Sequence, residues 1–236
     1  MERVPTGIAG YDDMLGGGYA LQCALLILGE PGTGKTTLGL QFSYPGVTRG
    51  DEPGLGLTFE ESPRQLFRDA AAFGWNLGEL ERAGKLRLVL ASPEVTLLDL
   101  QQTGGRLESM AREMGARRVL VDSLSHFERL TSDPAPAWLR STVFGFLNGL
   151  KREGLTAVLT RESQSLLGDE AESGDALGED LAYLVDSYTL MRYVEIDSAV
   201  RKALLVLKLR GSAHATGIRQ YDIGPGGVEV QSLFEG

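Results

Sequence analysis

Short apolar runs recur between residues 24 and 160, and stretches in which apolar positions follow helical spacing separate them. The runs predict strands, because each is only five or six residues long and is bounded by turn residues. Strands that alternate with helices predict a mostly parallel sheet covered by helices on both faces. The predicted strands are residues 24–28, 54–59, 86–90, 118–122 and 156–160, and the predicted helices are residues 35–44, 97–114 and 139–150.

The pattern changes after Tyr183, where four predicted strands are joined by short turns alone. About 50 residues bury too little surface to form a stable core of their own. We therefore expect these strands to extend the same sheet in antiparallel fashion, so that residues 1–236 form a single α/β domain. The strands are residues 187–195, 202–210, 219–223 and 227–231, and Gly224-Pro225-Gly226-Gly227 is typical of a hairpin turn.

Composition excludes several classes of protein. Hydrophobic residues at 42% and charged residues at 23% are typical of a globular chain. Cys23 is the only cysteine, which excludes an internal disulfide framework and a zinc site with four cysteine ligands. No apolar run approaches the roughly 20 residues that cross a bilayer, and the start of the chain does not resemble a signal peptide, so we expect a cytoplasmic protein without a membrane partner. The net charge of -9 disfavours nonspecific binding to nucleic acid.

The strongest local signal is a glycine-rich turn between the first predicted strand and the first predicted helix. It fits the pattern G-x-x-x-x-G-K-[ST], in which converging backbone N–H groups and the helix N-terminus bind the phosphates of a nucleotide. Lys35 would reach the β and γ phosphates, and the Thr36 hydroxyl would bind Mg²⁺. The binding residues that this motif predicts for ATP are Gly29, Pro31, Gly32, Thr33, Gly34, Lys35, Thr36 and Thr37.

Acidic residues end two of the other predicted strands. Asp122 follows the apolar run 118–121 and is predicted to hold Mg²⁺ through its water shell, because Mg²⁺ gives up water reluctantly. Glu60 and Glu61 follow the strand at 54–59, and Ser62-Pro63 then predicts the start of a helix. Neighbouring strand residues face opposite ways, so only one of the two acids should orient the water that attacks the γ phosphate. We favour Glu61, although periodicity alone leaves Glu60 open.

Together these motifs resemble the KaiC branch of the RecA-like ATPases. The resemblance spans nearly the whole chain in the right order and implies a RecA-like P-loop domain. Its sheet would be mostly parallel, with helices on both faces and an antiparallel C-terminal extension. The further segments that carry the resemblance are Thr6-Gly7-Ile8-Ala9-Gly10-Tyr11-Asp12 leading to Gly16-Gly17-Gly18, Phe73-Gly74-Trp75, Ala91-Ser92-Pro93 and the stretch from Lys208 to His214.

The resemblance also implies a homo-oligomeric ring, usually a hexamer, that holds ATP between subunits, hydrolyses it slowly and signals to a protein partner. It implies that Lys208 and Arg210 contact the phosphates bound by the adjacent subunit, with Ser212 and His214 nearby. A cation from a neighbour would stabilise the charge that develops during phosphoryl transfer. Thr160-Arg161-Glu162, at the end of another predicted strand, resembles a sensor position of the family.

The chain also departs from the clock proteins of that family. Their phosphorylated repeat carries a Ser-Thr pair four and three residues before an aspartate that matches Asp186. Here those two positions hold Ala182 and Tyr183. We therefore do not expect autokinase activity of the clock type.

Two alternative functions stay open. The first is a scaffold that binds ATP without hydrolysing it. The second is a DNA-dependent ATPase like the RecA and RadA recombinases, whose DNA loops follow the strands after the magnesium acid. The corresponding residues 163–180 contain six acids and neither Lys nor Arg, so they would repel a phosphate backbone. DNA is therefore not the expected partner.

Overall fold

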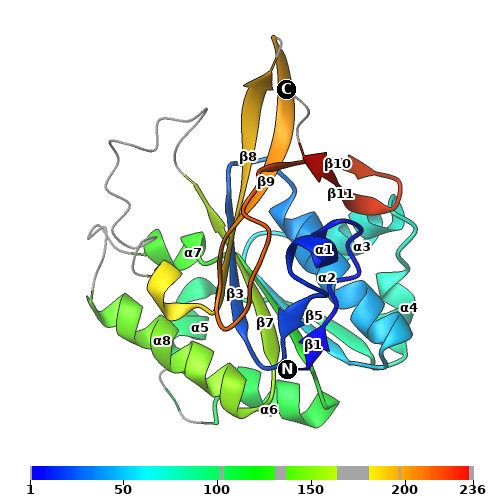
Figure 1. The fold of residues 1–236 in the computed structure, drawn as a ribbon. Helices are drawn as coiled ribbons and strands as arrows, with labels where there is room; N and C mark the ends of the chain where they lie inside the picture. The colour runs from blue at the N-terminus through cyan, green and yellow to red at the C-terminus, as the bar shows by residue number, and fades with distance from the viewer. Residues whose placement is uncertain are drawn as a thin grey trace.

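One large sheet runs through the molecule, and helices cover both of its faces (Figure 1). The computed structural model describes residues 2–100, 102, 104–130, 137–163, 181–196 and 198–233. Five of the six acids in the predicted loop at 163–180 lie in the segment 169–179 and the sixth is Asp180, so that interpretation falls outside the described residues.

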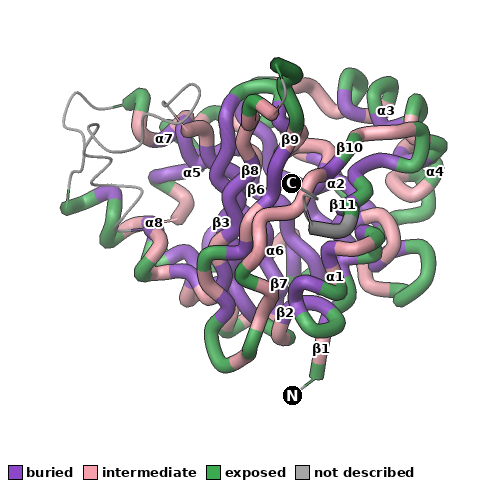
Figure 2. The backbone as a smooth tube through the Cα atoms, turned by 45° about the horizontal axis from the view of Figure 1, so that its top comes forward, coloured by how far each residue is buried: buried purple, intermediate pink, exposed green. Residues whose placement is uncertain are grey.

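The described part of the sheet has nine strands in the order β11-β10-β9-β8-β3-β7-β6-β4-β5. The six strands from β8 to β5 in this order run parallel to one another, which confirms the predicted fold class. Figure 2 shows the buried backbone concentrated along these strands. They are β3 (Ala24–Gly29), β4 (Gly54–Thr58), β5 (Leu86–Leu90), β6 (Arg118–Asp122), β7 (Thr156–Glu162) and β8 (Ser187–Ile196).

The C-terminal strands extend this sheet in antiparallel fashion, as expected. The strand β9 (Ala199–Leu209) pairs with β8, and β10 (Arg219–Gly224) pairs with β9 and with β11 (Gly227–Leu233). The turn between β10 and β11 coincides with the predicted glycine-proline turn. A small separate sheet joins β1 (Arg3–Val4) to β2 (Tyr19–Ala20).

Two groups of helices pack on the two faces, and a buried apolar cluster lies under each group. Leu38 and Phe42 belong to the first cluster, and Phe127 and Val143 to the second. No helix among the described residues is both long and apolar enough to cross a bilayer. The first group is α1 (Tyr11–Met14), α2 (Lys35–Arg49), α3 (Pro63–Ala71) and α4 (Leu77–Arg82), and the second is α5 (Pro93–Leu100), α6 (Arg106–Met114), α7 (Ser125–Glu128) and α8 (Ala137–Arg152).

Two predicted helix boundaries were wrong. Helix α2 continues through Pro45 to Arg49, and a Cβ on Gly7 would lie 2.5 Å from Cγ of Pro45, so the N-terminal segment packs tightly against the proline ring. The predicted helix at 97–114 is two helices, because the Asp99 carboxylate caps a new helix. It accepts hydrogen bonds from the backbone N–H groups of Arg106 (2.6 Å) and Leu107 (3.0 Å).

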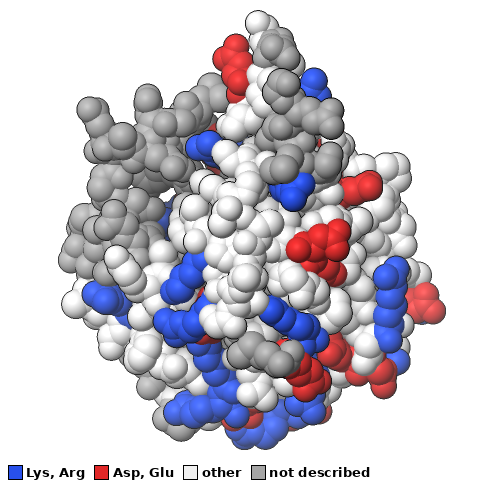
Figure 3. Space-filling view, viewed as in Figure 1, with Lys and Arg blue, Asp and Glu red and all other residues white. Residues whose placement is uncertain are grey.

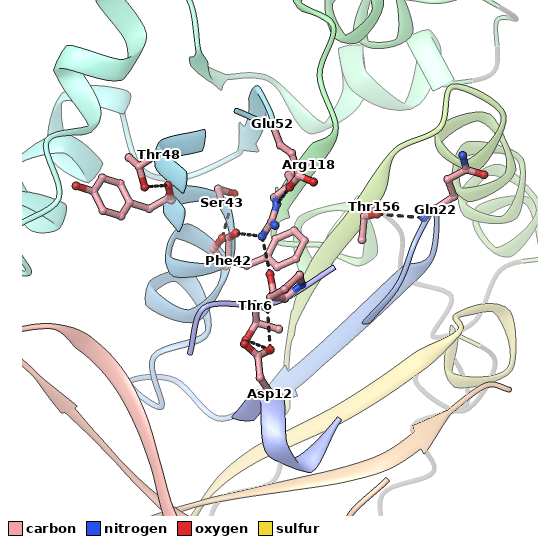
Figure 4. Close-up of polar contacts among 12 residues, drawn as sticks. Thr6, Asp12, Gln22, Phe42, Ser43, Thr48, Glu52, Arg118 and Thr156 are labelled. Atoms are coloured by element: carbon pink, nitrogen blue, oxygen red, sulfur yellow. Dashed lines mark hydrogen bonds and ion pairs between the residues drawn. The ribbon is translucent and has the colours of Figure 1, made fainter. Parts of the chain in front are cut away.

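A buried arginine joins the N-terminal segment, α2 and β6 (Figure 4). Arg118 forms an ion pair with Glu52 at 2.6 Å, and its Nη1 donates to the carbonyls of Pro5 (3.0 Å) and Phe42 (2.7 Å). Its guanidinium also lies 4.6 Å from the centre of the Phe42 ring. One side chain therefore satisfies two backbone carbonyls and holds three segments together.

The same N-terminal segment is fixed by Asp12. Its carboxylate accepts hydrogen bonds from the backbone N–H of Thr6 (2.8 Å), the Thr6 hydroxyl (2.7 Å) and the backbone N–H of Gly7 (3.1 Å). The Thr6–Asp12 motif of the sequence therefore stabilises the local conformation of the N-terminal segment, because three donors converge on one carboxylate.

We predict that Arg118→Met lowers the free energy of unfolding by about 2–4 kcal/mol, because Glu52 and two carbonyls lose a charged donor in a buried setting. Denaturant-induced unfolding measures the change. Arg112→Met is the matched control, since Arg112 pairs with Glu153 on the surface and its loss should leave the unfolding midpoint nearly unchanged. Equal effects of the two substitutions would contradict the central role of Arg118.

Candidate functional site

A pocket opens at the edge of the sheet where β3, β6 and β4 end. It brings together residues from the glycine-rich loop and from the acidic strand ends that the sequence had singled out. The predicted site residues that line it are Pro31, Gly32, Gly34, Lys35, Thr36, Thr37, Glu60, Glu61 and Asp122, and the further lining residues are Ser123, His126, Glu162 and Ile223.

The glycine-rich loop connects β3 directly to the first turn of α2. Gly32 (φ 79°) and Gly34 (φ 99°) adopt left-handed backbone conformations that residues with a Cβ rarely accept, and Gly34 is the N-cap of α2. The loop therefore directs the N-terminus of a 15-residue helix, with its free N–H groups, into the pocket. This geometry suits an anion.

Lys35 is the cation of the loop. Its side chain is buried, and Nζ donates to the carbonyl of Glu30 at 3.0 Å. Burial lowers the pKa of Lys35, while the nearby carboxylates of Glu162 and Asp122 oppose that shift. A bound phosphate would supply a negative partner that stabilises the charged form of the buried ammonium.

Asp122 lies at the end of β6 and is oriented by the neighbouring strand, because the Thr160 hydroxyl donates to its Oδ1. Together with the Thr36 hydroxyl it offers the hard oxygen donors that Mg²⁺ prefers. The described residues hold no group of three His, Cys, Asp or Glu side chains that could bind a metal by themselves. That donor set fits an ion such as Mg²⁺, which keeps several waters and takes further oxygens from phosphates.

Glu60 and Glu61 both line the pocket, but their surroundings differ. Burial and the nearby Asp122 raise the pKa of Glu61, and its backbone carbonyl accepts a hydrogen bond from the Thr58 hydroxyl at 2.8 Å. The Glu60 carboxyl is largely exposed, with Oε2 3.5 Å from Nε2 of His126. The choice of Glu61 as the residue that orients water stays a prediction.

Sequence reasoning missed part of the lining. Of the sensor-like trio at 160–162, only Glu162 lines the pocket, where it pairs with Arg129 at 2.6 Å. Arg161 is buried and pairs with Glu128 instead, also at 2.6 Å. His126 and Ile223 also line the pocket and were not predicted as site residues, and Ile223 gave no signal because it arrives from the antiparallel extension.

The C-terminal cations lie at the opposite edge of the sheet. In the strand register Leu209 pairs with Ser187, which pairs with Leu25 near the start of β3, whereas the glycine-rich loop begins at Gly29. Figure 3 shows Lys and Arg gathered near the amino ends of these strands. Lys208, Arg210, Ser212 and His214 therefore do not line the pocket of their own chain.

Local contacts hold these cations in place. Nζ of Lys208 donates to the carbonyls of Ala182 (2.8 Å) and Val185 (2.7 Å), and Arg210 lies 3.5 Å from the Asp186 carboxylate. Ser212 accepts a hydrogen bond from Arg3. Arg210 is thus presented on a surface that another molecule can reach, since its side chain is 61% exposed, whereas Lys208 is half-buried.

Comparisons with known proteins agree with this geometry. The chain matches the family model described as "ATPase: KaiC" over residues 4–235. It is 34% identical over 240 residues to the circadian clock oscillator protein KaiC of Parasynechococcus marenigrum, which covers 99% of this chain and 45% of the relative. It is 35% identical to that of Prochlorococcus marinus subsp. pastoris, with 99% and 46% covered. The chain therefore spans less than half the length of these relatives.

A solved structure is similar over its full length. The crystal structure of a KaiC-like protein from the hyperthermophilic archaeon Pyrococcus horikoshii superposes with a TM-score of 0.83 at 26% identity, covering 98% of this chain and 99% of that chain. The overall fold is thus shared with a solved KaiC-like protein.

We predict that Glu61→Gln stabilises the protein when nucleotide and metal are absent. Folding raises the pKa of Glu61 above its ordinary 4.5, so the folded state binds the proton more tightly than the unfolded state does. The stability of the wild type therefore falls as the pH rises from about 4.5 through the higher pKa of the folded state. The glutamine of the variant does not titrate, so the advantage of the variant in unfolding free energy should grow as the pH rises above about 4.5. Denaturant unfolding at several pH values measures it, with Glu60→Gln as control, and an advantage that shrinks with rising pH would contradict the prediction.

Proposed function

We propose, since the chain belongs to the KaiC family of ATPases, that it binds Mg²⁺ and ATP in this pocket and hydrolyses the ATP. The observation that carries the proposal is the convergence of three elements on one edge of the sheet. They are the glycine-rich loop that opens α2, the acid at the end of β6 and the acids that follow β4.

Each residue has a distinct role in the proposal. The backbone N–H groups of the loop and the ammonium of Lys35 bind the phosphates, which neutralises a cation that burial otherwise destabilises. The Thr36 hydroxyl would bind the metal directly, and the Asp122 carboxylate would hold it through water. Bound Mg²⁺ supplies positive charge that stabilises the transferring phosphoryl group.

Glu61 is proposed to orient the attacking water. Its raised pKa makes it a better proton acceptor than an ordinary carboxylate, and it lies beside Asp122 at the phosphate end of the pocket. Glu60 is less suited, because its carboxyl is 72% exposed and faces His126. Hydrolysis by a loose transition state needs such positioning more than it needs a strong base.

We further propose that the site is completed by a second copy of this chain in a ring. Four acids and only one lysine are found among the described lining residues, which leaves the pocket short of positive charge for a triphosphate. Lys208 and Arg210 lie at the opposite edge of the sheet, too far to reach their own loop. A heterologous contact between subunits would bring those cations to a neighbour's nucleotide.

The remaining parts of the proposal rest on the resemblance to the family. Residues 1–236 are treated as one domain, because the described strands of both halves share one sheet. We propose that binding and hydrolysis of ATP change the conformation of the protein and thereby signal to a protein partner. We do not propose a DNA substrate, since the net charge of -9 opposes it.

We predict that the wild type releases phosphate from Mg-ATP and that Glu61→Gln lowers kcat by about a hundredfold or more, because the water loses its oriented acceptor. Glu60→Gln should keep most of the activity. A steady-state phosphate-release assay measures both variants. A wild type that binds ATP without releasing phosphate would favour the non-hydrolysing scaffold, and a larger loss in Glu60→Gln would exchange the roles of the two acids.

The shared site predicts complementation between two defective variants. Lys35→Ala should lack phosphate binding and Arg210→Ala should lack the neighbour's cation, so each alone should be nearly inactive. When the two are co-expressed in equal amounts, about a quarter of random heterologous interfaces join an intact loop to an intact Arg210, and activity should recover to that extent.

The control is Lys35→Ala co-expressed with the double variant Lys35→Ala, Arg210→Ala, which cannot form an intact site. Full activity of Arg210→Ala alone, or a mixture that recovers nothing beyond this control, would remove Arg210 from the neighbour's site.

A further inference from the structure

The antiparallel extension reaches back over the glycine-rich loop of the same chain. Figure 1 shows β10 and β11 beside α2. The Gln41 side chain on α2 donates to the carbonyl of Val228 (3.0 Å) and accepts from its N–H (2.6 Å), and all three groups are buried. Two buried hydrogen bonds thus join the extension to α2, the helix that follows the glycine-rich loop.

One residue of the extension contacts the loop backbone itself. Tyr221 on β10 is fully buried, and its hydroxyl donates a hydrogen bond of 2.6 Å to the carbonyl of Thr33, which is also fully buried. Burial raises the pKa of Tyr221 well above its ordinary value, so the hydroxyl remains protonated and acts as a donor. A second residue of the same strand, Ile223, covers the next position, because a Cβ on Gly34 would lie 2.4 Å from its Cδ1.

Because the peptide bond is planar, the hydrogen bond from Tyr221 to the Thr33 carbonyl also affects the direction of the next N–H group. The Thr33 carbonyl and the Gly34 N–H belong to one peptide unit and point in opposite directions across its plane. A donor that fixes the carbonyl from the side of β10 therefore turns the Gly34 N–H away from β10. Gly34 lines the pocket in which a phosphate would bind, so an N–H turned away from β10 is available to a ligand there.

The hydrogen bond also restricts a loop that would otherwise be free to turn. Gly32 and Gly34 flank Thr33, and glycine has the widest choice of backbone conformations. Thr33 itself is held on its other side, since its hydroxyl donates to the Glu30 carbonyl at 2.7 Å. Tyr221 thus holds the Thr33 carbonyl and Glu30 holds the Thr33 side chain before any ligand arrives, which lowers the entropy lost on binding. Polarisation of the carbonyl further strengthens the attached N–H as a donor.

We propose that Tyr221 is a positioning residue for phosphate binding, whose hydroxyl orients the Thr33–Gly34 peptide toward the ligand. The proposal rests on the proposed function, since it assigns a task within the same nucleotide site. The residue binds no phosphate itself and acts through the loop backbone.

The test compares Tyr221→Phe with the wild type, because this change removes one hydroxyl and keeps the ring that fills the core. Calorimetry measures the affinity for Mg-ATP and for Mg-tripolyphosphate, which has no base or ribose, and thermal unfolding measures stability. The loss of one hydrogen bond should weaken both ligands by about three- to tenfold. The matched control is Tyr11→Phe, which removes the hydroxyl of another fully buried tyrosine, bonded to Tyr19 and, at 2.6 Å, to Thr189 rather than to the loop. It should leave both affinities unchanged.

Each other outcome overturns the inference. Wild-type affinity in Tyr221→Phe, whatever its stability, would show that the hydroxyl does not prepare the loop. Weakened binding of ATP with unchanged binding of tripolyphosphate would place its effect on the nucleoside. Equal weakening in Tyr11→Phe would reduce the effect to general destabilisation. A wild type that binds neither ligand would refute the proposed function itself and this inference with it.

Discussion

The pocket depends on the parallel register of the central strands, which makes their carboxyl ends meet at one edge of the sheet. Gly29 at the end of β3 pairs with Glu162, and Thr58 at the end of β4 pairs with Asp122. Backbone hydrogen bonds therefore set the distance between the glycine-rich loop and the acids before any side chain is considered. A shift of one residue in either pair would turn the acid to the other face of the sheet, so the chemistry of the site follows from strand pairing.

The sequence predicted the strands, the loop and the acids because each signal is local. An apolar run that ends in a glycine turn or an acid predicts a strand, and it predicts that the turn or acid lies at the carboxyl end of that strand. The two wrong helix boundaries show where local signals fail. A proline normally ends a helix, yet α2 continues through Pro45, whose ring packs against Gly7, and Asp99 starts a new helix by capping it. The contribution of Ile223 depends on a chain reversal almost 190 residues after the loop, which no local pattern encodes.

The antiparallel extension connects the C-terminal cations with the glycine-rich loop, two regions that lie far apart in the sequence. Its strand β9 ends next to the cations at one edge of the sheet, and β10 then returns across the sheet to the loop at the other edge. Lys208 and Arg210 are held by carbonyls and by Asp186, while Tyr221 holds the Thr33 carbonyl. A subunit that engages a neighbour's nucleotide through β9 would thereby act on the same segment that supports its own loop. In the proposed ring, this continuity would offer a physical route for communication between subunits.

The central claim is that the loop around Lys35 and the acid at the end of β6 form one site for a triphosphate and its metal. Isothermal titration of ATP into the wild type and into Lys35→Ala, each with and without Mg²⁺, tests it most directly. The account predicts one nucleotide per chain, tighter binding when Mg²⁺ is present, and an affinity about a hundredfold lower in the variant, because a buried charged contact to phosphate is lost. Binding that is independent of Mg²⁺ and unchanged by Lys35→Ala would contradict it.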